Sequence, residues 1–329
     1  MQAQVHSPTA ANLRRLAAAL RQGELVAIPT ETVYGLAADA LNASACQAIF
    51  KAKGRPTHDP LIVHVLDLAH AEQLADFNEP ARKLARHFWP GPLTLVLPKK
   101  ACVPGIVTAG RDTVAIRSPA HPLARRLLRL SGVPLAAPSA NLFGYVSPTS
   151  AAHVVAGLGG KIPAVLDGGP CRVGVESTIL DLTDPAHPRI LRPGAVTAAE
   201  LEKFLRVKIA ARAATRGTRQ KATAGLLAPG LLPQHYSPHT PLLSKRHWLR
   251  LPADVAGIHL RRPAGRTAPN VYWLSPRGAL AEVARNLYRV LRAADEAGHR
   301  QIWIEALPGD SGGLAAAIND RLKRAAAKR

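Results

Sequence analysis

The chain has 329 residues, 47% of them hydrophobic, which is enough for two domains that each bury a core. No apolar run reaches the ~18 residues that a membrane-spanning helix needs, and the N-terminus lacks the basic start and apolar core of a signal peptide, so we expect a cytoplasmic protein. The formal net charge of +21, from 43 Lys and Arg against 22 Asp and Glu, favours nucleotides, phosphates or RNA as partners.

Residues 1–200 alternate predicted helices with short strands. Leu13, Leu16 and Leu20 lie at helical spacing, and Gly23 ends this helix before the apolar run LVAI. Further short strands are predicted in PLIVHV, PLTLVLP, TVAIRSP, AVLDGG and STILDL, with a helix in HPLARRLLRLSG, and the domain should end near RILRPGAV. This alternation predicts an α/β domain with a mixed sheet.

The cysteines of this first domain argue against a structural metal and against disulfide bonds. Cys46, Cys102 and Cys171 are far apart in the sequence, form no C-x-x-C pair and have no histidine at metal-ligand spacing. We therefore predict no metal-ligating residues.

Residues 201–244 are predicted to form a basic, proline-rich linker. After a helix-like TAAELEKFLRV, the stretch from Lys203 to Lys221 has seven basic residues and no acidic one. The segment LLAPGLLPQHYSPHTPLL contains four prolines and should run extended. Residues 201–329 carry 23 Lys and Arg against 8 Asp and Glu, net +15, which fits RNA contact but also fits an arginine-rich genome.

Residues 245–329 are predicted to form a smaller domain. Strands are expected in AGIHLRRP, VYWLSP and QIWIEALP, and helices in GALAEVARNLYRVLRAADEAG and GLAAAINDRLKRAAA. The order strand, helix, strand, helix predicts a Rossmann-like α/β unit, but no G-x-G-x-x-G follows its strands.

Polar residues cluster where the strands of the first domain end. The motif IPTETVYGL places hydroxyls at Thr30 and Thr32 after a strand, where ligands of open sheets bind, although a helix-capping turn would use Thr30 in the same way. In KAKGRPTHDP, Lys53 and Arg55 flank Gly54 and could both reach one polyphosphate, although a charged surface turn has the same composition.

Further cations and small hydroxyls follow other strands. Arg117 ends TVAIR, and burying it requires an anionic partner, either a ligand carboxylate or a structural Asp. APSANLFGYVSPTS is a loop rich in small polar groups, and by itself it could be an ordinary turn. GVESTILDL places Ser177 and Thr178 just before a strand, and RILRPGAV supplies Arg192 ahead of a Pro-Gly turn. No P-loop, nucleophile elbow or H-E-x-x-H is present, so the set favours catalysis by positioning and by stabilising phosphate charge.

Taken together, these segments resemble the threonylcarbamoyl-AMP synthase family, the YrdC-like enzymes, in the long form with an appended C-terminal domain. The matching stretches, in the family's order, are IPTETVYGLAADA, KAKGRPTHDPLIVHV, WPGPLTLVLP, TVAIRSP, PLAAPSAN, SPT, DGG, GVESTILDL, ILRPGAV and the linker segment APGLLPQHYSPHTPL. The resemblance implies a twisted mixed YrdC-like sheet with helices, plus a smaller Rossmann-like domain.

The implied activity is that of a nucleotidyltransferase, L-threonylcarbamoyladenylate synthase. L-Threonine, bicarbonate and ATP, with Mg²⁺, would give threonylcarbamoyl-AMP and pyrophosphate, and the product would feed the N6-threonylcarbamoyl modification of adenosine 37 in tRNA. The threonine amine would capture CO₂ or bicarbonate, and the carbamate oxygen would attack the α-phosphate. The expected partners are these substrates, the tRNA-modification machinery and tRNA or double-stranded RNA itself, with no membrane.

The resemblance also implies roles for individual residues. The expected threonine-binding residues are Thr32, His64, Arg117, Ser139 and Ser177. The expected catalytic residues, which would hold the triphosphate, are Lys53 and Arg55. The expected ATP-binding residues are Arg55, Asp59, Thr113, Asn141, Thr149, Arg192, His235 and Tyr236, the last two as a lid that keeps water from the adenylate.

Three positions depart from the family pattern. Asp59 stands where asparagine is common, Phe143 replaces a small residue, and Gln234 replaces a frequent basic one. The main alternative to the enzyme is a non-catalytic protein that binds tRNA or double-stranded RNA, in which Lys53 and Arg55 would grip the RNA backbone. A carbamoyl-transfer maturation enzyme is excluded, because the chain has no room or cysteines for the extra domains of that class.

Overall fold

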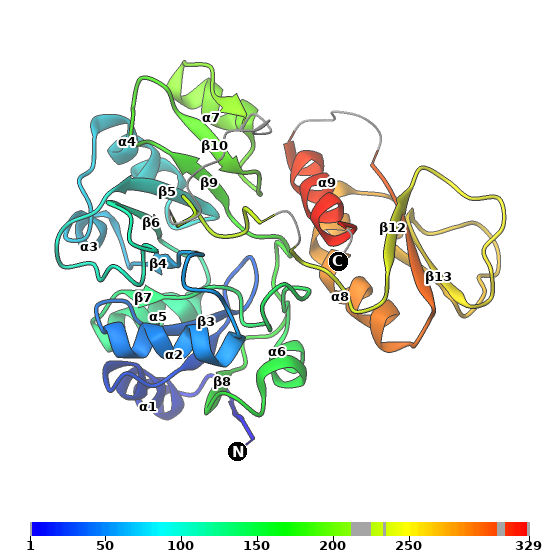
Figure 1. The fold of residues 1–329 in the computed structure, drawn as a ribbon, viewed down its shortest axis with the longest axis horizontal. Helices are drawn as coiled ribbons and strands as arrows, with labels where there is room; N and C mark the ends of the chain where they lie inside the picture. The colour runs from blue at the N-terminus through cyan, green and yellow to red at the C-terminus, as the bar shows by residue number, and fades with distance from the viewer. Residues whose placement is uncertain (1, 212–224, 233–234, 308–312, 328–329) are drawn as a thin grey trace.

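The computed structural model describes residues 2–211, 225–232, 235–307 and 313–327. These residues form a larger domain around an 11-stranded mixed sheet and a smaller domain around a 4-stranded parallel sheet (Figure 1). Both parts of the predicted fold class are confirmed. The basic stretch from Lys203 to Lys221 lies largely outside the described residues.

The strands of the larger domain are β1 (Gln4–His6), β2 (Val26–Ile28), β3 (Gly35–Asp39), β4 (Ile62–His64), β5 (Leu93–Pro98), β6 (Thr113–Arg117), β7 (Leu135–Ala136), β8 (Ala164–Leu166), β9 (Thr178–Asp181), β10 (Arg189–Arg192) and β11 (Ala210–Ala211). Its helices are α1 (Ala10–Arg21), α2 (Ala43–Lys53), α3 (Leu68–Glu72), α4 (Glu79–Phe88), α5 (Pro122–Ser131), α6 (Ala151–Leu158) and α7 (Ala198–Leu205). The smaller domain contains β12 (Leu242–Lys245), β13 (Val255–Arg261), β14 (Val271–Ser275), α8 (Leu280–Glu296), β15 (Gln301–Glu305) and α9 (Gly313–Ala325).

Local sequence signals explain where these helices begin and end. Thr9 caps α1 by accepting a hydrogen bond from the Asn12 amide, and Asn42 caps α2 in the same way. The α2 helix ends at Gly54, whose left-handed conformation (φ 62°) suits glycine. Lys53 is therefore the last residue of a helix, whereas the sequence pattern indicated only a turn.

The two faces of the large sheet have different coverings. Val63, Leu95 and Ile116 point to the face that packs against helices, in the largest hydrophobic core. On the opposite face Ile62 and Ala115 pack against Ala228 and Leu231, which belong to the proline-rich segment. This segment therefore lies across one face of the sheet and covers its central strands.

Two details differ from the sequence-based expectations. The IPTETVYGL segment joins the antiparallel strands β2 and β3, so it does not lead from a strand into a helix. The larger sheet also continues beyond residue 200, because α7 precedes β11 and β11 pairs in parallel with β10. The predicted linker, 201–244, thus begins with secondary structure of the larger domain and ends within β12.

The smaller domain is arranged in the strand order β12-β15-β13-β14, and every pairing is parallel. In Figure 1 its helices α8 and α9 lie on the side of the sheet that faces the larger domain. The hydrophobic core of this domain includes Val33, Val146 and Val175 from the larger domain. The core of the smaller domain is therefore shared with these three loops of the larger domain.

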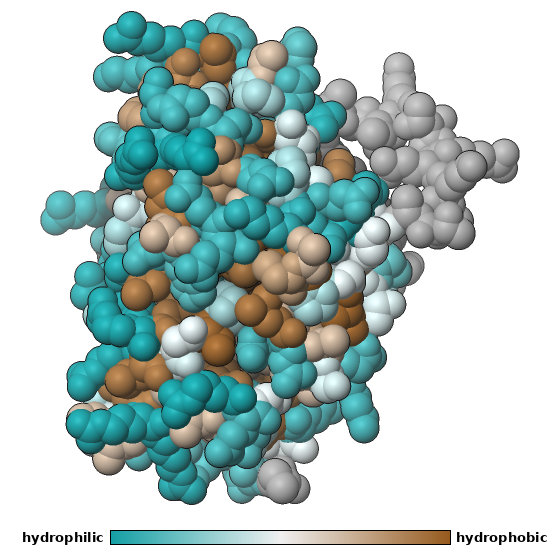
Figure 2. All heavy atoms as spheres, turned by 90° about the vertical axis from the view of Figure 1, so that its left-hand side faces the viewer, coloured by the Kyte–Doolittle hydropathy of each residue, from teal (hydrophilic) through white to brown (hydrophobic). Residues whose placement is uncertain are grey.

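The outer face of the larger domain carries both polar and apolar side chains (Figure 2), and the three cysteines are unpaired. Hydrophilic side chains cover most of the larger domain's outer face, with apolar side chains between them (Figure 2). Among the helices that the structure describes, none is both long and apolar enough to cross a membrane. Cys46, Cys102 and Cys171 are free thiols, and the described ranges contain no cluster of metal-ligating side chains.

Candidate active site

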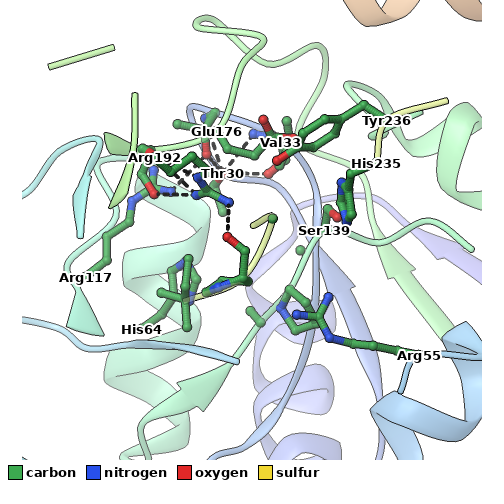
Figure 3. A pocket seen from close by; sticks show the side chains of 18 residues that line it. Thr30, Val33, Arg55, His64, Arg117, Ser139, Glu176, Arg192, His235 and Tyr236 are labelled. Carbon is green, nitrogen blue, oxygen red and sulfur yellow. Dashed lines mark hydrogen bonds between the residues drawn. The ribbon is translucent and has the colours of Figure 1, made fainter. Parts of the chain in front are cut away.

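A cavity of about 40 Å³ lies between the large sheet and the proline-rich segment (Figure 3). It is lined by nine of the predicted site residues: Thr32, Arg55, His64, Arg117, Ser139, Ser177, Arg192, His235 and Tyr236. The sheet explains this convergence. His64, Arg117 and Arg192 are the last residues of β4, β6 and β10, and the strand pairings give these three strands the same direction.

Arg117 is buried and holds the segment that follows β2. Its Nη2 donates to Glu31 Oε1 at 2.6 Å, its Nη1 donates to Thr32 Oγ1 at 3.0 Å, and its Nε donates to the Gly91 carbonyl. Burial raises the pKa of Glu31, but the attraction and hydrogen bond of Arg117 outweigh this and leave that pKa below its usual value. The anionic partner expected for Arg117 is thus present within the chain as Glu31.

Arg55 forms a second buried ion pair, with Asp59. Arg55 Nη2 lies 3.0 Å from Asp59 Oδ2, and Arg55 Nε and Nη2 donate to the carbonyls of Asp59 and Pro60. Burial raises the pKa of Asp59 despite the neighbouring guanidinium. Asp59 therefore acts on the site through Arg55, and it does not itself line the cavity.

Lys53 is buried and turned toward the loop after β7. Its Nζ donates to the carbonyls of Ser139 and Asn141, at 2.5 and 2.6 Å. Burial, reinforced by the nearby Arg55, lowers the pKa of Lys53 well below its usual value. Lys53 does not line the cavity, so in this conformation it positions Ser139 rather than facing the space where a ligand would lie.

Arg192 joins three segments. It donates to the carbonyl and the Oγ of Ser177 and to the carbonyl of Pro229 in the proline-rich segment. The Ser177 hydroxyl also lies 2.8 Å from Thr94 Oγ1 on β5. Ser177, which was predicted from GVESTILDL, is therefore held by Arg192 and by Thr94.

Glu176 lines the cavity and is the most extensively bonded carboxylate there. Its oxygens accept hydrogen bonds from Ser147, at 2.7 Å, and from Tyr288 and Arg321 of the smaller domain. Burial raises its pKa, but Arg321, Arg192 and the hydrogen bonds lower it to about 2. Glu176 is therefore ionised at neutral pH.

Two histidines border the cavity in their neutral form. Burial, together with the positive charge of Arg117, lowers the pKa of His64 to about 3. Burial and Arg55 likewise lower the pKa of His235 to about 3. Neither Nδ1 has a hydrogen-bond partner among the described residues, and the Tyr236 hydroxyl has none either.

Besides Asp59, three predicted ATP-binding residues lie outside the cavity. Thr113 begins β6, at the opposite end from Arg117, and lines a separate hollow beside Arg111. The Asn141 side chain donates to the carbonyls of Leu142 and Tyr145. Thr149, which precedes α6, contacts His153 within that helix. In this conformation these residues shape their own loops, and their predicted contacts with a nucleotide stay predictions.

Two residues that line the cavity, Glu176 and Thr30, are not among the predicted site residues. Glu176 immediately precedes Ser177, and Thr30 Oγ1 lies 2.9 Å from Thr32 Oγ1. Both belong to motifs that the sequence analysis singled out, so proximity to Ser177 and Thr32 was the available signal. Two partners of Glu176, Tyr288 and Arg321, lie more than 100 positions away in the sequence, so no local motif reveals them.

Comparisons with known proteins cover both domains. A family model described as "Telomere recombination", for Sua5, YciO and YrdC proteins, matches residues 18–194. A second, described as "Threonylcarbamoyl-AMP synthase, C-terminal domain", matches residues 196–327.

Individual relatives agree with these matches. The threonylcarbamoyl-AMP synthase of Pyrococcus abyssi is 41% identical over 330 residues, covering 96% of this chain and 94% of that protein. That of Vibrio vulnificus is 36% identical over 186 residues, covering 56% of this chain and 98% of that protein. The crystal structure of P. abyssi Sua5 complexed with L-threonine is similar with a TM-score of 0.85 at 37% identity, covering 98% of this chain and 97% of that one.

Proposed function

This chain belongs to the threonylcarbamoyl-AMP synthase family in its two-domain form, and from that premise we propose that it makes threonylcarbamoyl-AMP and pyrophosphate from L-threonine, bicarbonate and ATP. The observation that carries the proposal is the convergence of three buried guanidinium groups, Arg55, Arg117 and Arg192, on one cavity. The anions to be held there are the threonine carboxylate, bicarbonate and the phosphates of ATP. The product would serve tRNA N6-threonylcarbamoyladenosine modification.

We assign the threonine carboxylate to Arg117. A guanidinium has five N–H donors, and the hydrogen bonds of Arg117 to other described residues use three of them, which leaves one each on Nη1 and Nη2. These two match a carboxylate in a bidentate pair. Glu31 and Thr32 would orient the fork, and neutral His64 beside Arg117 would contact the bound amino acid without repelling its ammonium group.

We assign the phosphates to Arg55 and Arg192. Nη1 of Arg55 has no partner among the described residues, and Arg55 lines the cavity. The reaction forms a bond between a carbamate oxygen and the α-phosphorus and breaks the bond to the β-phosphate oxygen. Positioned cations stabilise the charge that builds up on the departing pyrophosphate, and no protein nucleophile is needed.

Mg²⁺ is proposed to enter with ATP as part of the substrate. The described residues contain no group of three acidic or histidine side chains that could form a protein cage for the ion. Mg²⁺ commonly keeps several waters and binds through substrate phosphates. Bound in this way, it would neutralise phosphate charge.

The proline-rich segment is proposed to open for the substrates and to close over them. A cavity of about 40 Å³ cannot hold ATP, since pockets for ligands of that kind measure roughly 300–1,000 Å³. Pro229, Gly230, His235 and Tyr236 form its covering side. Closure would exclude water from the labile adenylate.

The decisive experiment is a pyrophosphate-release assay with ATP, Mg²⁺, bicarbonate and threonine. We expect release only when threonine and bicarbonate are both present. Release that continues without either one would overturn the proposed reaction. The competing interpretation, a non-catalytic tRNA-binding protein, predicts no release at all, together with RNA affinity that falls steeply with salt.

A further inference from the structure

Helix α8 of the smaller domain contacts the two loops that carry cavity residues. Arg285 donates to the Arg172 carbonyl at 2.9 Å, and Arg292 donates to the Val146 carbonyl at 2.5 Å. Gly174 has φ 81° and lies so close to α8 that an added Cβ would overlap the backbone of Arg285. The loops before Ser147 and Glu176 are therefore held by backbone contacts with this helix.

Apolar contacts follow the same pattern. The three larger-domain valines in the shared core each adjoin a polar residue in or beside the cavity. Val33 follows Thr32, Val146 precedes Ser147, and Val175 precedes Glu176. A shift of the smaller domain would thus displace these polar groups.

The contact between the two domains also includes a buried ion pair, which involves Glu176. Arg321 of α9 donates to Glu176 Oε2 at 2.7 Å, and the Tyr288 hydroxyl of α8 lies 2.9 Å from the same oxygen. Arg321, Tyr288 and Glu176 are all buried. Without Arg321, the buried carboxylate of Glu176 would lose its ion pair, and only the nearby Arg192 would offset its charge beside a cavity proposed to receive anions.

Arg321 and Tyr288 also contact Tyr236, the tyrosine of the proline-rich segment that lines the cavity. The Tyr236 ring stacks on Tyr288 with centroids 5.8 Å apart, and the Arg321 guanidinium lies over the Tyr236 ring at 5.2 Å. Arg321 and Tyr288 therefore contact the loop carboxylate and the covering segment at once. They can hold both only when the segment is closed.

These residues do not supply a reacting group. The V. vulnificus relative carries the same synthase name, and its 98% coverage by 186 aligned residues makes it too short to contain both domains. Neither Arg321 nor Tyr288 lines the cavity. Their effect on the site must pass through Glu176 and Tyr236.

We propose that Arg321 and Tyr288 are positioning residues: the smaller domain fixes the Glu176–Ser177 loop and the Tyr236 segment in the geometry that binds threonine and ATP. This inference rests on the proposed function, because it assigns the smaller domain a part in the same reaction. The contribution of the smaller domain is assigned to two side chains, Arg321 and Tyr288.

The test is a double-mutant cycle on the full chain with Arg321→Met, Glu176→Gln and the combined variant, assayed as threonine-dependent pyrophosphate release. We expect Arg321→Met to raise the threonine KM at least tenfold with a smaller change in kcat. The combined variant should recover most of that rise, because removing the charge of Glu176 removes the need for Arg321. Arg300→Met is the matched control, since Arg300 pairs with Asp254 on the surface of the same domain.

Two further measurements separate positioning from folding. Tyr288→Phe keeps the ring on Tyr236 but removes the hydroxyl from Glu176, and we expect a smaller rise in KM without a change in the circular dichroism spectrum. Hydrogen exchange of the Ser237 amide, which is bonded to the Gly144 carbonyl, should accelerate in Arg321→Met. If Arg321→Met matches Arg300→Met, or if its effect and that of Glu176→Gln simply multiply, the positioning role is wrong. If the wild-type chain releases no pyrophosphate, the proposed function itself fails.

Discussion

Arg117 shows why the guanidinium group, and not merely a positive charge, is needed in the pocket. Its donors reach a carboxylate, a hydroxyl and a carbonyl in three directions and still leave two N–H groups for a ligand. A lysine ammonium has three donors on a single atom and cannot reproduce this fork.

Arg117→Lys should therefore retain the charge but lose the bidentate contact. We expect the threonine KM to rise at least tenfold, since a charge-assisted hydrogen bond contributes about 1.5–3 kcal/mol and 1.4 kcal/mol is a factor of ten. The measurement is steady-state kinetics with threonine varied. Arg126→Lys, on the exposed face of α5, is the control, and equal KM values for the two variants would contradict the assignment.

The charge of Lys53 could be recognised in the sequence, but the orientation of its side chain could not. The sequence predicted a cation near phosphate, whereas its Nζ lies on the carbonyls of Ser139 and Asn141. The direction follows from its position as the last residue of α2, next to the loop after β7.

Lys53→Met should lower both stability and activity. Removing Nζ leaves the buried Asn141 carbonyl without a donor, at a cost of about 1–3 kcal/mol, whereas the Ser139 carbonyl keeps its bond from the Asn141 amide. Urea denaturation should show the loss, and pyrophosphate release should fall because Ser139 is no longer held. Lys51→Met changes an exposed lysine of the same helix and should stay within about 0.5 kcal/mol of wild type. Equal stability of the two variants would count against this role for Lys53.

At the scale of elements, the site depends on strand direction and on close approach between loops. The ends of β4, β6 and β10 share one edge of the sheet, and Ser177 precedes β9 at that edge. The turn after β10 packs directly onto this last loop. A Cβ added at Gly194 would lie 2.5 Å from the carbonyl carbon of Ser177 and 2.6 Å from the main-chain carbonyl oxygen of Glu176.

Gly194→Ala should therefore displace the Glu176–Ser177 loop. Overpacking of this kind costs about 1–3 kcal/mol, and we expect a lower melting temperature with at least a tenfold loss of kcat/KM. Gly105→Ala is the matched control, because nothing lies within 4 Å of a Cβ at Gly105. Calorimetry and the pyrophosphate assay on both variants provide the check, and a normally active Gly194→Ala would refute the close-packing argument.

At the scale of the whole molecule, closure of the pocket buries neutral histidines. His64 and His235 have pKa values of about 3, because burial and nearby positive charges disfavour the imidazolium. The charged groups that act on His235 are Arg55, Glu176, Lys53 and Arg192. In the unfolded chain both histidines take up a proton near their ordinary value of about 6.5.

Stability should consequently fall as the pH is lowered. The unfolded chain binds more protons than the folded protein between pH 6.5 and 3, so each of these histidines removes up to about 1.4 kcal/mol of folding free energy per pH unit in that window. Urea denaturation at pH 7.5 and 5.0 should show a lower midpoint at pH 5.0. His235→Phe should flatten this dependence, and an unchanged or higher wild-type midpoint at pH 5.0 would contradict it.

The domain order, most strands and nine of the residues that line the cavity could be predicted before the fold was known. These are local properties: apolar runs with fixed periods, glycines that end helices, and family motifs in one order. The tertiary structure alone decided that Lys53 faces a loop, that Asp59 pairs with Arg55, and that Arg321 and Tyr288 meet Glu176 and Tyr236. The physical reason is that burial requires each charge to find a partner, and packing, not sequence proximity, brings those partners together.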